Sequence, residues 1–503
     1  MKKYAIISLS NKENIGYLCS VLKKNNIYMI ASGKTSQEIK KMGYLCNQLS
    51  DYTQNKEILD GRIKTLNSSL YASILYNRNN ATHKKEIARL KFPNIEFVIV
   101  NFYPFKKKYL SSNIKKNLVD LIDIGGPTLL RSAAKNYKYI TAISDIDDYE
   151  ILEKELKKNN SKTTLKFRKL MAAKVFEKTS TYDNYIANWM SSKKNNAFIF
   201  DKDNKKKLRY GENHHQKSFV YTQSADENYF DCMIQGKILG YNNILDIDSA
   251  LNCIKDFGKY TCVIIKHNNP CGISSNINKY KSFLMARKTD PISAFGGVVI
   301  FNFVVDEKLA KMIVKKFFEI VIALNFTQKA INILRKREKL ILIKSKNIKM
   351  GNNVEIKSIN SGYLVQEINR IKITKKNLSC VSGVKVNDKR IEDLIFGFMV
   401  CKHVKSNAIV LIKNKSTVGI GAGQMSRIDA TKIALNKKDK KIKNFIAASD
   451  AFFPFIDNVD LLYKNNCKGI IQPSGSINDS KIIKFCSDKK IPLYFTSYRF
   501  FKH

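Results

Sequence analysis

The stretch Thr261–Gly272, TCVIIKHNNPCG, places a cation and an imidazole at the end of a predicted strand. Its apolar part, Cys262–Ile265, is rich in β-branched residues and predicts a buried strand. Lys266 and His267 follow directly, and the Asn-Asn-Pro after them is typical of a turn. Because ligands bind just beyond strand ends in open α/β sheets, these two side chains are candidate site residues.

A second polar segment, TDPISAFGG at Thr289–Gly297, follows soon afterwards in the chain. It brings Asp290, a proline, a hydroxyl group and two glycines together after a predicted helix over residues 279–287. Two polar segments of this kind so close together indicate a functional site rather than a feature of packing.

The length and composition are those of a folded protein with several domains. A chain of 503 residues with 44% hydrophobic content is long enough for two to four of them. No segment approaches the roughly 18 uninterrupted apolar residues of a membrane helix, and the N-terminus lacks a small-residue cleavage site. The ten cysteines form no CxxC pair, so we interpret them as reduced thiols and predict no metal site. These features predict a cytoplasmic protein without a membrane partner.

The net charge is +45, from 88 Lys and Arg against 43 Asp and Glu. Such an excess would suit a nucleic acid or another polyanion. Lysine is nevertheless spread along the whole chain beside Asn and Ile, without a basic stripe or a known nucleic-acid motif. We therefore interpret the charge as a compositional bias and predict no specific nucleic-acid partner. A basic RNA-binding protein is the alternative from a different functional class.

The first part of the chain alternates predicted strands and helices. Strands are expected at residues 3–10, 27–31 and 97–100, and helices at 15–24, 37–42, 129–136 and 164–189. This alternation predicts a mostly parallel sheet. Polar helix starts near residues 32–35 and 125–128 offer backbone N–H groups to a phosphate, and for residues 32–35 an ordinary helix cap is the alternative. Residues 191–196 have linker composition, so a domain boundary is predicted there.

The second part has fewer clear patterns. Strands are expected at 197–200 and 408–412, and helices after residue 248 and at 392–404. The spacing Gly419-x-Gly421-x-Gly423 is similar to a dinucleotide fingerprint, but its third glycine is one residue early and no acidic ribose reader follows. The aromatic run at 452–455 suits the flat face of a heterocycle, with core packing as the alternative. No repeat between the halves is recognised.

Eleven segments together resemble one family and occur in its order from about residue 5 to residue 503: GRIKTL, VNFYPF, DIGGPTLLRSAAKN, LRYGEN, YNNILDID, KHNNPCG, DPISAFGG, GIGAGQMSRI, SDAFFPF, PSGSI and RFFKH. The family is the bifunctional purine-biosynthesis enzyme that combines AICAR formyltransferase with IMP cyclohydrolase. The resemblance implies an α/β protein with a methylglyoxal-synthase-like parallel-sheet domain at 1–195 and cytidine-deaminase-like α/β formyltransferase layers, without zinc, at 196–503. It also implies formyl transfer from 10-formyltetrahydrofolate to AICAR, dehydrative ring closure to IMP, and a homodimer.

For formyl transfer, the acceptor is a weak aromatic amine, so a base must take its proton while a cation stabilises the oxyanion. His267 is the predicted base and Lys266 the predicted stabiliser. The resemblance implies that Asn407 orients this chemistry and that Asp290 positions the formyl group or its water. It also implies a set of substrate contacts: Arg209 and Tyr210 near the phosphate, Arg499 at the carboxamide, Phe452, Phe453 and Phe455 around the aminoimidazole, and Asp457.

For ring closure, the resemblance implies three groups of residues. The proton-transfer and oxyanion-holding positions are Lys64, Tyr103, Asp123 and Lys135. Neighbouring contacts are Arg62, Thr65 and Asn101, and the phosphate seat is Ser8, Lys12, Ser32, Gly33 and Thr35. Lys34 stands where the family usually has a second glycine, and Asn67-Ser68 replaces the usual His-Pro. The alternative is therefore a formyltransferase whose cyclohydrolase domain has decayed.

Overall fold

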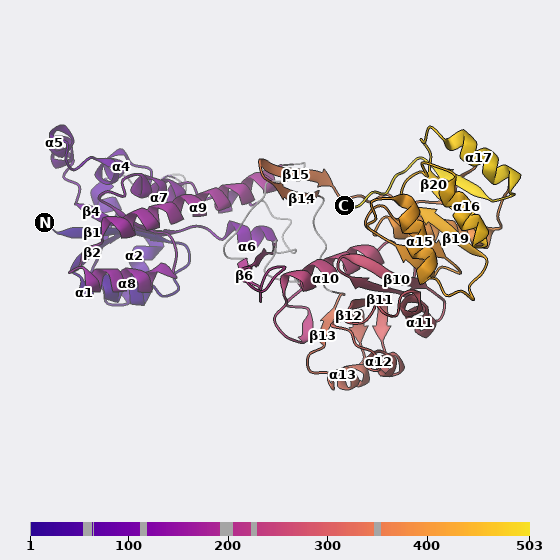
Figure 1. Ribbon diagram of the computed structural model, residues 1–503. Coiled ribbons are helices and arrows are strands. Elements are labelled where there is room, and N and C mark those ends of the chain that lie inside the picture. The colour runs from indigo at the N-terminus through magenta and orange to yellow at the C-terminus, as the bar shows by residue number, and fades with distance from the viewer. Residues whose placement is uncertain are drawn as a thin grey trace. The chain divides into compact units, whose positions relative to one another are not determined.

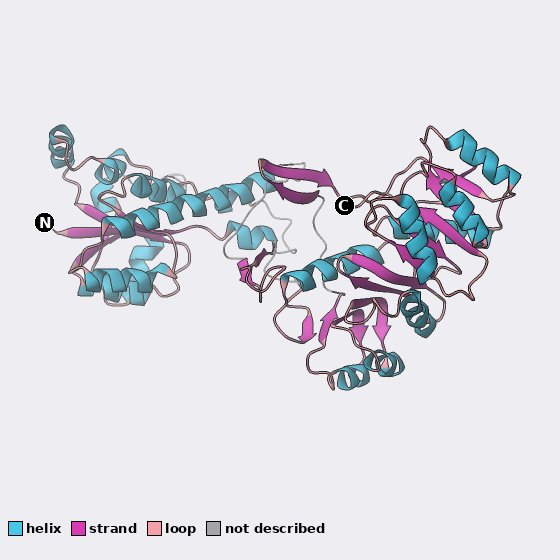
Figure 2. Ribbon diagram, in the orientation of Figure 1, coloured by secondary structure: helices cyan, strands magenta, loops and turns pink. Residues whose placement is uncertain are grey.

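The computed structural model describes residues 2–53, 63, 65–110, 118–191, 205–222, 229–346 and 354–503 (Figure 1, Figure 2). Contacts within the chain divide it into two compact units, Met1–Asp201 and Lys202–His503. The predicted boundary at 195/196 and the predicted strand at 197–200 lie outside the described residues, so both stay predictions.

The N-terminal unit is built on a parallel sheet, as predicted. Its strands are β1 Lys3–Leu9, β2 Ile27–Ala31, β3 Cys46–Gln48, β4 Ile95–Asn101 and β5 Thr141–Ile143. Their order is β3-β2-β1-β4-β5, and every neighbouring pair is parallel. The helices are α1 Ile15–Lys24, α2 Gly33–Lys41, α3 Ser50–Thr53, α4 Ser68–Leu75, α5 Ala81–Leu90, α6 Phe105–Leu110, α7 Gly125–Lys135, α8 Asp148–Lys158 and α9 Leu165–Met190.

Strand β1 shows why this sheet is buried on both faces. Ala5 and Ile7 belong to the core that α1 and α8 cover, whereas Ile6 belongs to the core that α4 and α7 cover. Side chains alternate across a strand, so a continuous apolar run is what a doubly covered strand requires. Figure 1 shows α1 and α8 on one side of the sheet and α4 and α7 on the other.

The C-terminal unit contains two six-stranded mixed sheets. The elements of its first half are β8 Met233–Gln235, α10 Tyr241–Ile254, β9 Thr261–Lys266, β10 Asn269–Ser275, α11 Lys279–Thr289, β11 Val298–Val305, α12 Glu307–Val314, β12 Ile320–Phe326, α13 Gln328–Leu334 and β13 Ile341–Lys344. Those of its second half are β16 Ser379–Cys380, α14 Asp388–Cys401, β17 Ile409–Ile412, β18 Thr417–Gly421, α15 Arg427–Lys437, β19 Phe445–Ser449, α16 Asp457–Lys464, β20 Cys467–Pro473, α17 Asp479–Asp488 and β21 Leu493–Thr496. Two small hairpins complete the unit: β6 Lys205–Lys207 with β7 Phe219–Tyr221, and β14 Val354–Ile359 with β15 Gly362–Glu367.

The two large sheets have the same topology. Their orders are β10-β9-β11-β12-β13-β8 and β18-β17-β19-β20-β21-β16. Each has an antiparallel hairpin at one edge, an antiparallel step to the next strand, two parallel steps and an antiparallel last strand. The helices also recur in the same places along the chain. The C-terminal unit is therefore an internal duplication. The sequence did not reveal it, because the two halves share their strand order but no recognisable pattern of residues.

The cores of this unit lie in layers. One core joins α10 and α14 to the first sheet through residues such as Ile265 and to the second sheet through residues such as Val410. Helices α11, α12 and α13 cover the other face of the first sheet. Helices α15, α16 and α17 cover the other face of the second sheet. Among the described residues, no helix is both long and apolar enough to cross a bilayer.

The glycines at 419–423 serve helix packing. Gly419 and Gly421 lie within β18 rather than in a strand-to-helix turn. A Cβ atom at Gly421 would lie 1.9 Å from the carbonyl oxygen of Ala430 in α15, and one at Gly419 would lie 2.1 Å from that of Ala434. The absence of side chains at these positions lets α15 approach the strand, which accounts for the glycine pattern without a dinucleotide.

Replacing Gly421 by Ala is expected to lower the free energy of unfolding by about 1–3 kcal/mol, because the backbone of α15 would have to move away. Gly258→Ala is the matched control, since among the described residues no atom beyond its chain neighbours lies within 4 Å of the position its Cβ would take. Denaturant titrations of both variants check this. Equal stability of the two variants would contradict the packing role of Gly421.

Candidate functional site

His267 lies in the tight turn of the β9–β10 hairpin. Lys266 pairs with Asn269, which leaves His267 and Asn268 as the two turn residues. Both are left-handed, with φ angles of 52° and 63°, as a type I′ turn requires. The predicted buried strand and the turn after it are confirmed. The hairpin was not predicted: β10 begins at Asn269, and β9 is antiparallel to both of its neighbours. The hairpin leaves His267 exposed and Lys266 half-buried.

Lys266 joins this hairpin to the second polar segment. Its Nζ atom donates a hydrogen bond to the carbonyl oxygen of Phe295. The Phe295 ring is 63% exposed and its centroid lies 4.9 Å from that of Phe317. The two segments that the sequence singled out therefore meet. Phe295 was not predicted as a site residue, although it lies within the quoted DPISAFGG segment.

Asp290 is buried and forms an ion pair with Lys437, whose side chain is 40% exposed. Its Oδ2 atom accepts hydrogen bonds from Lys437 Nζ at 2.7 Å and Ser293 Oγ at 2.6 Å, and its Oδ1 atom accepts one from the Ser293 backbone at 2.9 Å. Burial acts to raise the pKa of Asp290, but these hydrogen bonds outweigh burial and hold the pKa below its usual value. The carboxylate thus fixes the loop that follows α11.

This ion pair predicts a pH dependence of stability. Because the pKa of Asp290 is lower in the folded state, its contribution is present above the unfolded pKa of about 4 and is lost as the pH falls through the folded pKa. In Asp290→Asn the stability is expected to fall less steeply than in the wild type as the pH drops below about 4. Lys437→Met removes the same pair and should have the same effect. Thermal melts between neutral and acidic pH check this, and unchanged slopes in both variants would contradict it.

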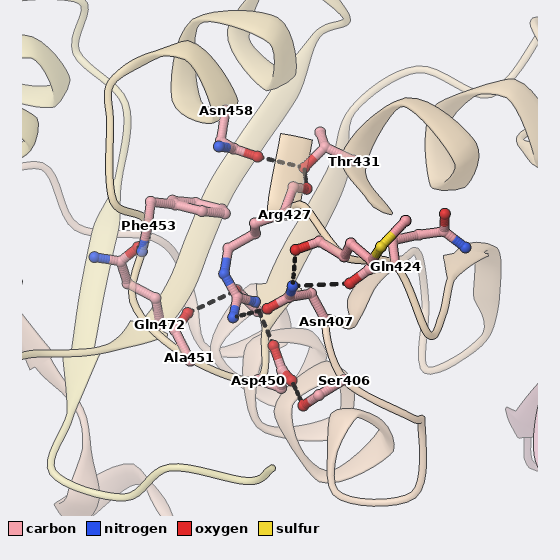
Figure 3. Close-up of polar contacts among 12 residues, drawn as sticks. Ser406, Asn407, Gln424, Arg427, Thr431, Asp450, Ala451, Phe453, Asn458 and Gln472 are labelled. Carbon is pink, nitrogen blue, oxygen red and sulfur yellow. Dashed lines mark hydrogen bonds and ion pairs between the residues drawn. The ribbon is translucent and has the colours of Figure 1, made fainter. Parts of the chain in front are cut away.

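The Asn407 side chain is held by three hydrogen bonds (Figure 3). Its Oδ1 atom accepts one from Arg427 at 2.8 Å. Its Nδ2 atom donates to the carbonyl oxygens of Gln424 at 2.8 Å and Met425 at 3.1 Å. The amide is therefore fixed in one orientation, between β17 and the loop that precedes α15.

A buried ion pair supports Asn407. Asp450 is fully buried and receives hydrogen bonds from Arg427 and from the hydroxyl of Ser406 (Figure 3). Arg427, 7% exposed, also donates to Ser449 Oγ at 2.9 Å. Sequence reasoning missed both members of the pair. The signal was the presence of a charge in each of two quoted segments, GIGAGQMSRI and SDAFFPF, but pattern alone could not pair them.

A cleft of about 280 Å³ opens beside Asn407. The backbone N–H of Lys405 donates to Asn269 Oδ1 at 2.9 Å, which ties this region to the His267 hairpin. The Arg499 guanidinium lies 4.4 Å from the ring centroid of Phe501, a residue of the cleft wall. The wall consists of Ser406, Asn407, Gly423, Gln424, Met425, Phe501 and His503. The cleft therefore lies between Asn407 and the C-terminal residues.

Arg209 and Tyr210 lie beside the start of α10. The backbone N–H of Tyr241 donates to the Tyr210 carbonyl at 3.3 Å, and the Arg209 guanidinium lies 5.3 Å from the Tyr210 ring centroid. Arg209 is exposed and Tyr210 is half-buried. The structure thus brings this segment to the helix that also contacts the His267 turn.

The aromatic run at 452–455 has mixed surroundings. Phe453 is fully buried in the core under α15 and α16. For this ring the core-packing alternative therefore holds, rather than the predicted contact with the aminoimidazole. Phe452 is half-buried, and Phe455 is 62% exposed. Asp457 is exposed in the first turn of α16.

The predicted phosphate seat lies at the carboxyl edge of the N-terminal sheet. Asn101, at the end of β4, accepts backbone hydrogen bonds from Ser10 at 2.6 Å and Asn11 at 3.0 Å, and so holds the loop after β1. This loop contains the half-buried Lys12, and Ser8 precedes it in β1. The Thr35 hydroxyl accepts from the Leu9 backbone at 3.2 Å.

The start of α2 completes this edge. Ser32 precedes the helix, yet its side chain makes no cap hydrogen bond, so an ordinary cap does not account for it. Gly33 has a φ of 43°, a value that favours glycine. Lys34 follows it and is exposed.

Three predicted cyclohydrolase residues gather at the start of α7. Asp123 Oδ1 accepts from the backbone N–H of Gly126 at 2.8 Å. Burial and the negative charge of Asp123 raise the pKa of Tyr103. A Cβ atom at Gly125 would lie 2.2 Å from Thr65 Oγ1, which places that hydroxyl against the same turn.

One further predicted cyclohydrolase residue, Lys135, is not brought into this cluster. Lys135 lies in the last turn of α7, about 15 Å along the helix axis from its start. Its catalytic role stays a prediction. Arg62 and Lys64 lie outside the described residues.

Comparisons with known proteins cover the whole chain. Residues 133–437 match the family described as AICARFT/IMPCHase bienzyme, and residues 15–128 match the MGS-like domain. The bifunctional purine biosynthesis protein PurH of Caldicellulosiruptor bescii is 41% identical over 515 residues, covering 100% of both chains. PurH of Buchnera aphidicola subsp. Acyrthosiphon pisum is 42% identical, covering 100% of this chain and 99% of that one. This chain therefore belongs to the AICARFT/IMPCHase bienzyme family.

Proposed function

We propose that formyl transfer takes place at the His267 hairpin and ring closure at the carboxyl edge of the N-terminal sheet. As a member of the bienzyme family, the chain catalyses the last two steps of IMP biosynthesis, AICAR formylation and IMP cyclohydrolysis. One observation carries the assignment of the transferase site. The backbone hydrogen bond from Lys405 to Asn269 joins the His267 hairpin to the segment that holds Asn407.

His267 serves as the base in this site. The AICAR amine is conjugated with its ring and is a weak nucleophile, so removal of its proton as the C–N bond forms lowers the barrier. The exposed position of His267 leaves the imidazole accessible to a substrate. Lys266 stabilises the oxyanion, or the nitrogen that leaves the formyl group, from the same hairpin.

Contacts for both substrates are proposed around this centre. The formyl donor is a folate, and we propose that it is 10-formyltetrahydrofolate. The exposed ring of Phe295 beside Lys266 offers a stacking face to a heterocycle. Arg209 is proposed to bind the AICAR phosphate and Arg499 its carboxamide, with Phe455 at the ring.

Ring closure is proposed to use the cluster at the start of α7. The reaction is intramolecular, so a site that holds the formamide against the carboxamide does much of the work. Tyr103 and Asp123 are proposed to move protons there together with Lys64. The loop held by Asn101 and the start of α2 are proposed to bind the phosphate through backbone N–H groups.

The departures from the family pattern do not favour a decayed cyclohydrolase. Asn67 caps α4: its Oδ1 atom accepts from the backbone N–H groups of Ser69 at 3.0 Å and Leu70 at 3.1 Å. A structural role therefore accounts for this departure, because asparagine is among the best helix caps. Lys34 is exposed and adds a positive charge beside the proposed phosphate seat.

A homodimer is proposed as the working form. The β14–β15 hairpin has no buried residue, and its Tyr363, Leu364 and Val365 are 65%, 57% and 55% exposed. A two-stranded hairpin is marginally stable in water, so a second copy of the chain is the proposed cover. The cysteines of the described residues are free thiols, which suits the cytoplasm as the proposed location.

The test supplies AICAR and 10-formyltetrahydrofolate and follows tetrahydrofolate and IMP together. Stoichiometric appearance of both products is expected. Tetrahydrofolate without IMP would mean that only the transferase is active. The absence of both products would overturn the proposal. A filter-binding titration over salt concentration addresses the RNA-binding alternative, which requires tight binding with a steep salt slope.

A further inference from the structure

The duplication places two equivalent tight turns in the C-terminal unit. In the first half, His267 and Asn268 are left-handed between β9 and β10. In the second half, Asn414 and Lys415 are left-handed between β17 and β18, with φ angles of 52° and 50°. The flanking residues Lys413 and Ser416 exchange backbone hydrogen bonds at 2.9 and 3.2 Å, as a two-residue turn requires.

Each turn is held by an aspartate from the same place on an equivalent helix. Helices α10 and α14 both have 14 residues, and Asp246 and Asp393 are each the sixth residue. Asp246 accepts the backbone N–H of Asn268 at 2.7 Å. Asp393 accepts the backbone N–H groups of Asn414 at 2.9 Å and Lys415 at 2.6 Å.

The lysine before each turn is also duplicated. Lys266 donates to the carbonyl oxygen of Phe295, three residues before β11. Lys413 donates to the carbonyl oxygen of Lys443 at 2.7 Å, two residues before β19. The aspartate and the lysine therefore belong to the common scaffold of both halves. The imidazole is what distinguishes the first turn, because Asn414 takes the equivalent position in the second.

We propose that Asp246 is the positioning residue of the transferase: its carboxylate holds the left-handed turn and so fixes the backbone from which His267 projects. This inference rests on the proposed function of His267. A non-glycine residue at positive φ is disfavoured, so two such residues in succession need an external partner. Burial raises the pKa of both Asp246 and Asp393 and opposes their ionisation, while the N–H groups of the turns favour the carboxylates.

The test compares Asp246→Asn with Asp393→Asn, which weakens the same clamp in the half that lacks the imidazole. Asp246→Asn is expected to lower kcat of formyl transfer by roughly 10–10²-fold, with little change in KM for AICAR, because the base is misplaced while the substrate contacts remain. Asp393→Asn is expected to lower Tm by about as much as Asp246→Asn does, and to leave kcat of formyl transfer unchanged. Ring closure of supplied formyl-AICAR should persist in both.

A double variant separates positioning from a direct chemical role. Glycine at the second turn position favours the type I′ conformation without help from a carboxylate, so Asp246→Asn/Asn268→Gly should regain much of the lost kcat. Failure of this rescue would overturn positioning through the turn. If Asp246→Asn keeps the wild-type kcat while His267→Ala is inactive, the positioning role of Asp246 is overturned but the proposed function stands. Full activity of His267→Ala would overturn the proposed function itself.

Discussion

His267→Ala is expected to reduce the rate of formyl transfer by ~10²–10⁴-fold, the usual contribution of one positioned proton transfer. The substitution is not expected to disturb the fold, because the imidazole is exposed at the tip of a hairpin. Ring closure of supplied formyl-AICAR should continue at its normal rate, because the two units have separate cores. Separate assays of tetrahydrofolate release and IMP formation check both expectations.

Asn414→Ala is the matched control for this variant. Asn414 is the first residue of the equivalent turn in the second half, and it is exposed like His267. Formyl transfer in Asn414→Ala should remain at the wild-type rate, and its Tm should resemble that of His267→Ala. Loss of both reactions in His267→Ala would contradict two separate sites. An equal loss of formyl transfer in the two variants would show that the hairpins act through stability.

The parts of the fold that were predicted correctly have local patterns in the sequence. The N-terminal parallel sheet follows from its alternating apolar strands and helices, and α1 was predicted with its observed bounds, Ile15–Lys24. The His267 hairpin was not predicted, because a buried strand reads the same whether its neighbours are parallel or antiparallel. Asn268 and Asn269 look alike in sequence, yet one forms the turn and the other begins β10.

The partners of the candidate residues could not be predicted from the sequence. Asp246 is 21 residues from His267 and acts through its backbone contacts with the turn. Arg427, the first residue of α15, and Asp450, which follows β19, are separated by 23 residues and meet because α15 packs on the sheet that contains β19. The duplication itself is a property of strand order. Motifs thus identify candidate site residues, whereas the groups that hold those residues emerge from tertiary structure.

Arg427→Met is expected to lower the free energy of unfolding of the C-terminal unit by about 3–5 kcal/mol, because Asp450 would remain as a buried charge without its cation. The side chains of this pair are 6% and 0% exposed, so water cannot replace the lost partner. Formyl transfer should also fall, since Asn407 would lose the donor that fixes its Oδ1 atom. Denaturant unfolding and the tetrahydrofolate assay measure the two effects.

Lys432→Met is the matched control on the same helix. Its Nζ atom lies 3.2 Å from Asp429 Oδ1, but both side chains are more than half exposed, at 58% and 54%. A solvent-exposed pair contributes about 0–1 kcal/mol, so this variant should resemble the wild type in stability and activity. Similar losses of stability in both variants would contradict the importance of burial at Arg427.

The double variant Arg427→Met/Asp450→Leu separates stability from function. Replacing both members of a buried ion pair by apolar residues is often neutral or stabilising, so much of the stability lost in Arg427→Met should return. Formyl transfer should not return with it, because the hydrogen bond from Arg427 to Asn407 is still missing. Recovery of both properties would mean that the orientation of Asn407 is irrelevant to the reaction. Recovery of stability alone would identify the ion pair as a device that holds Asn407 for catalysis.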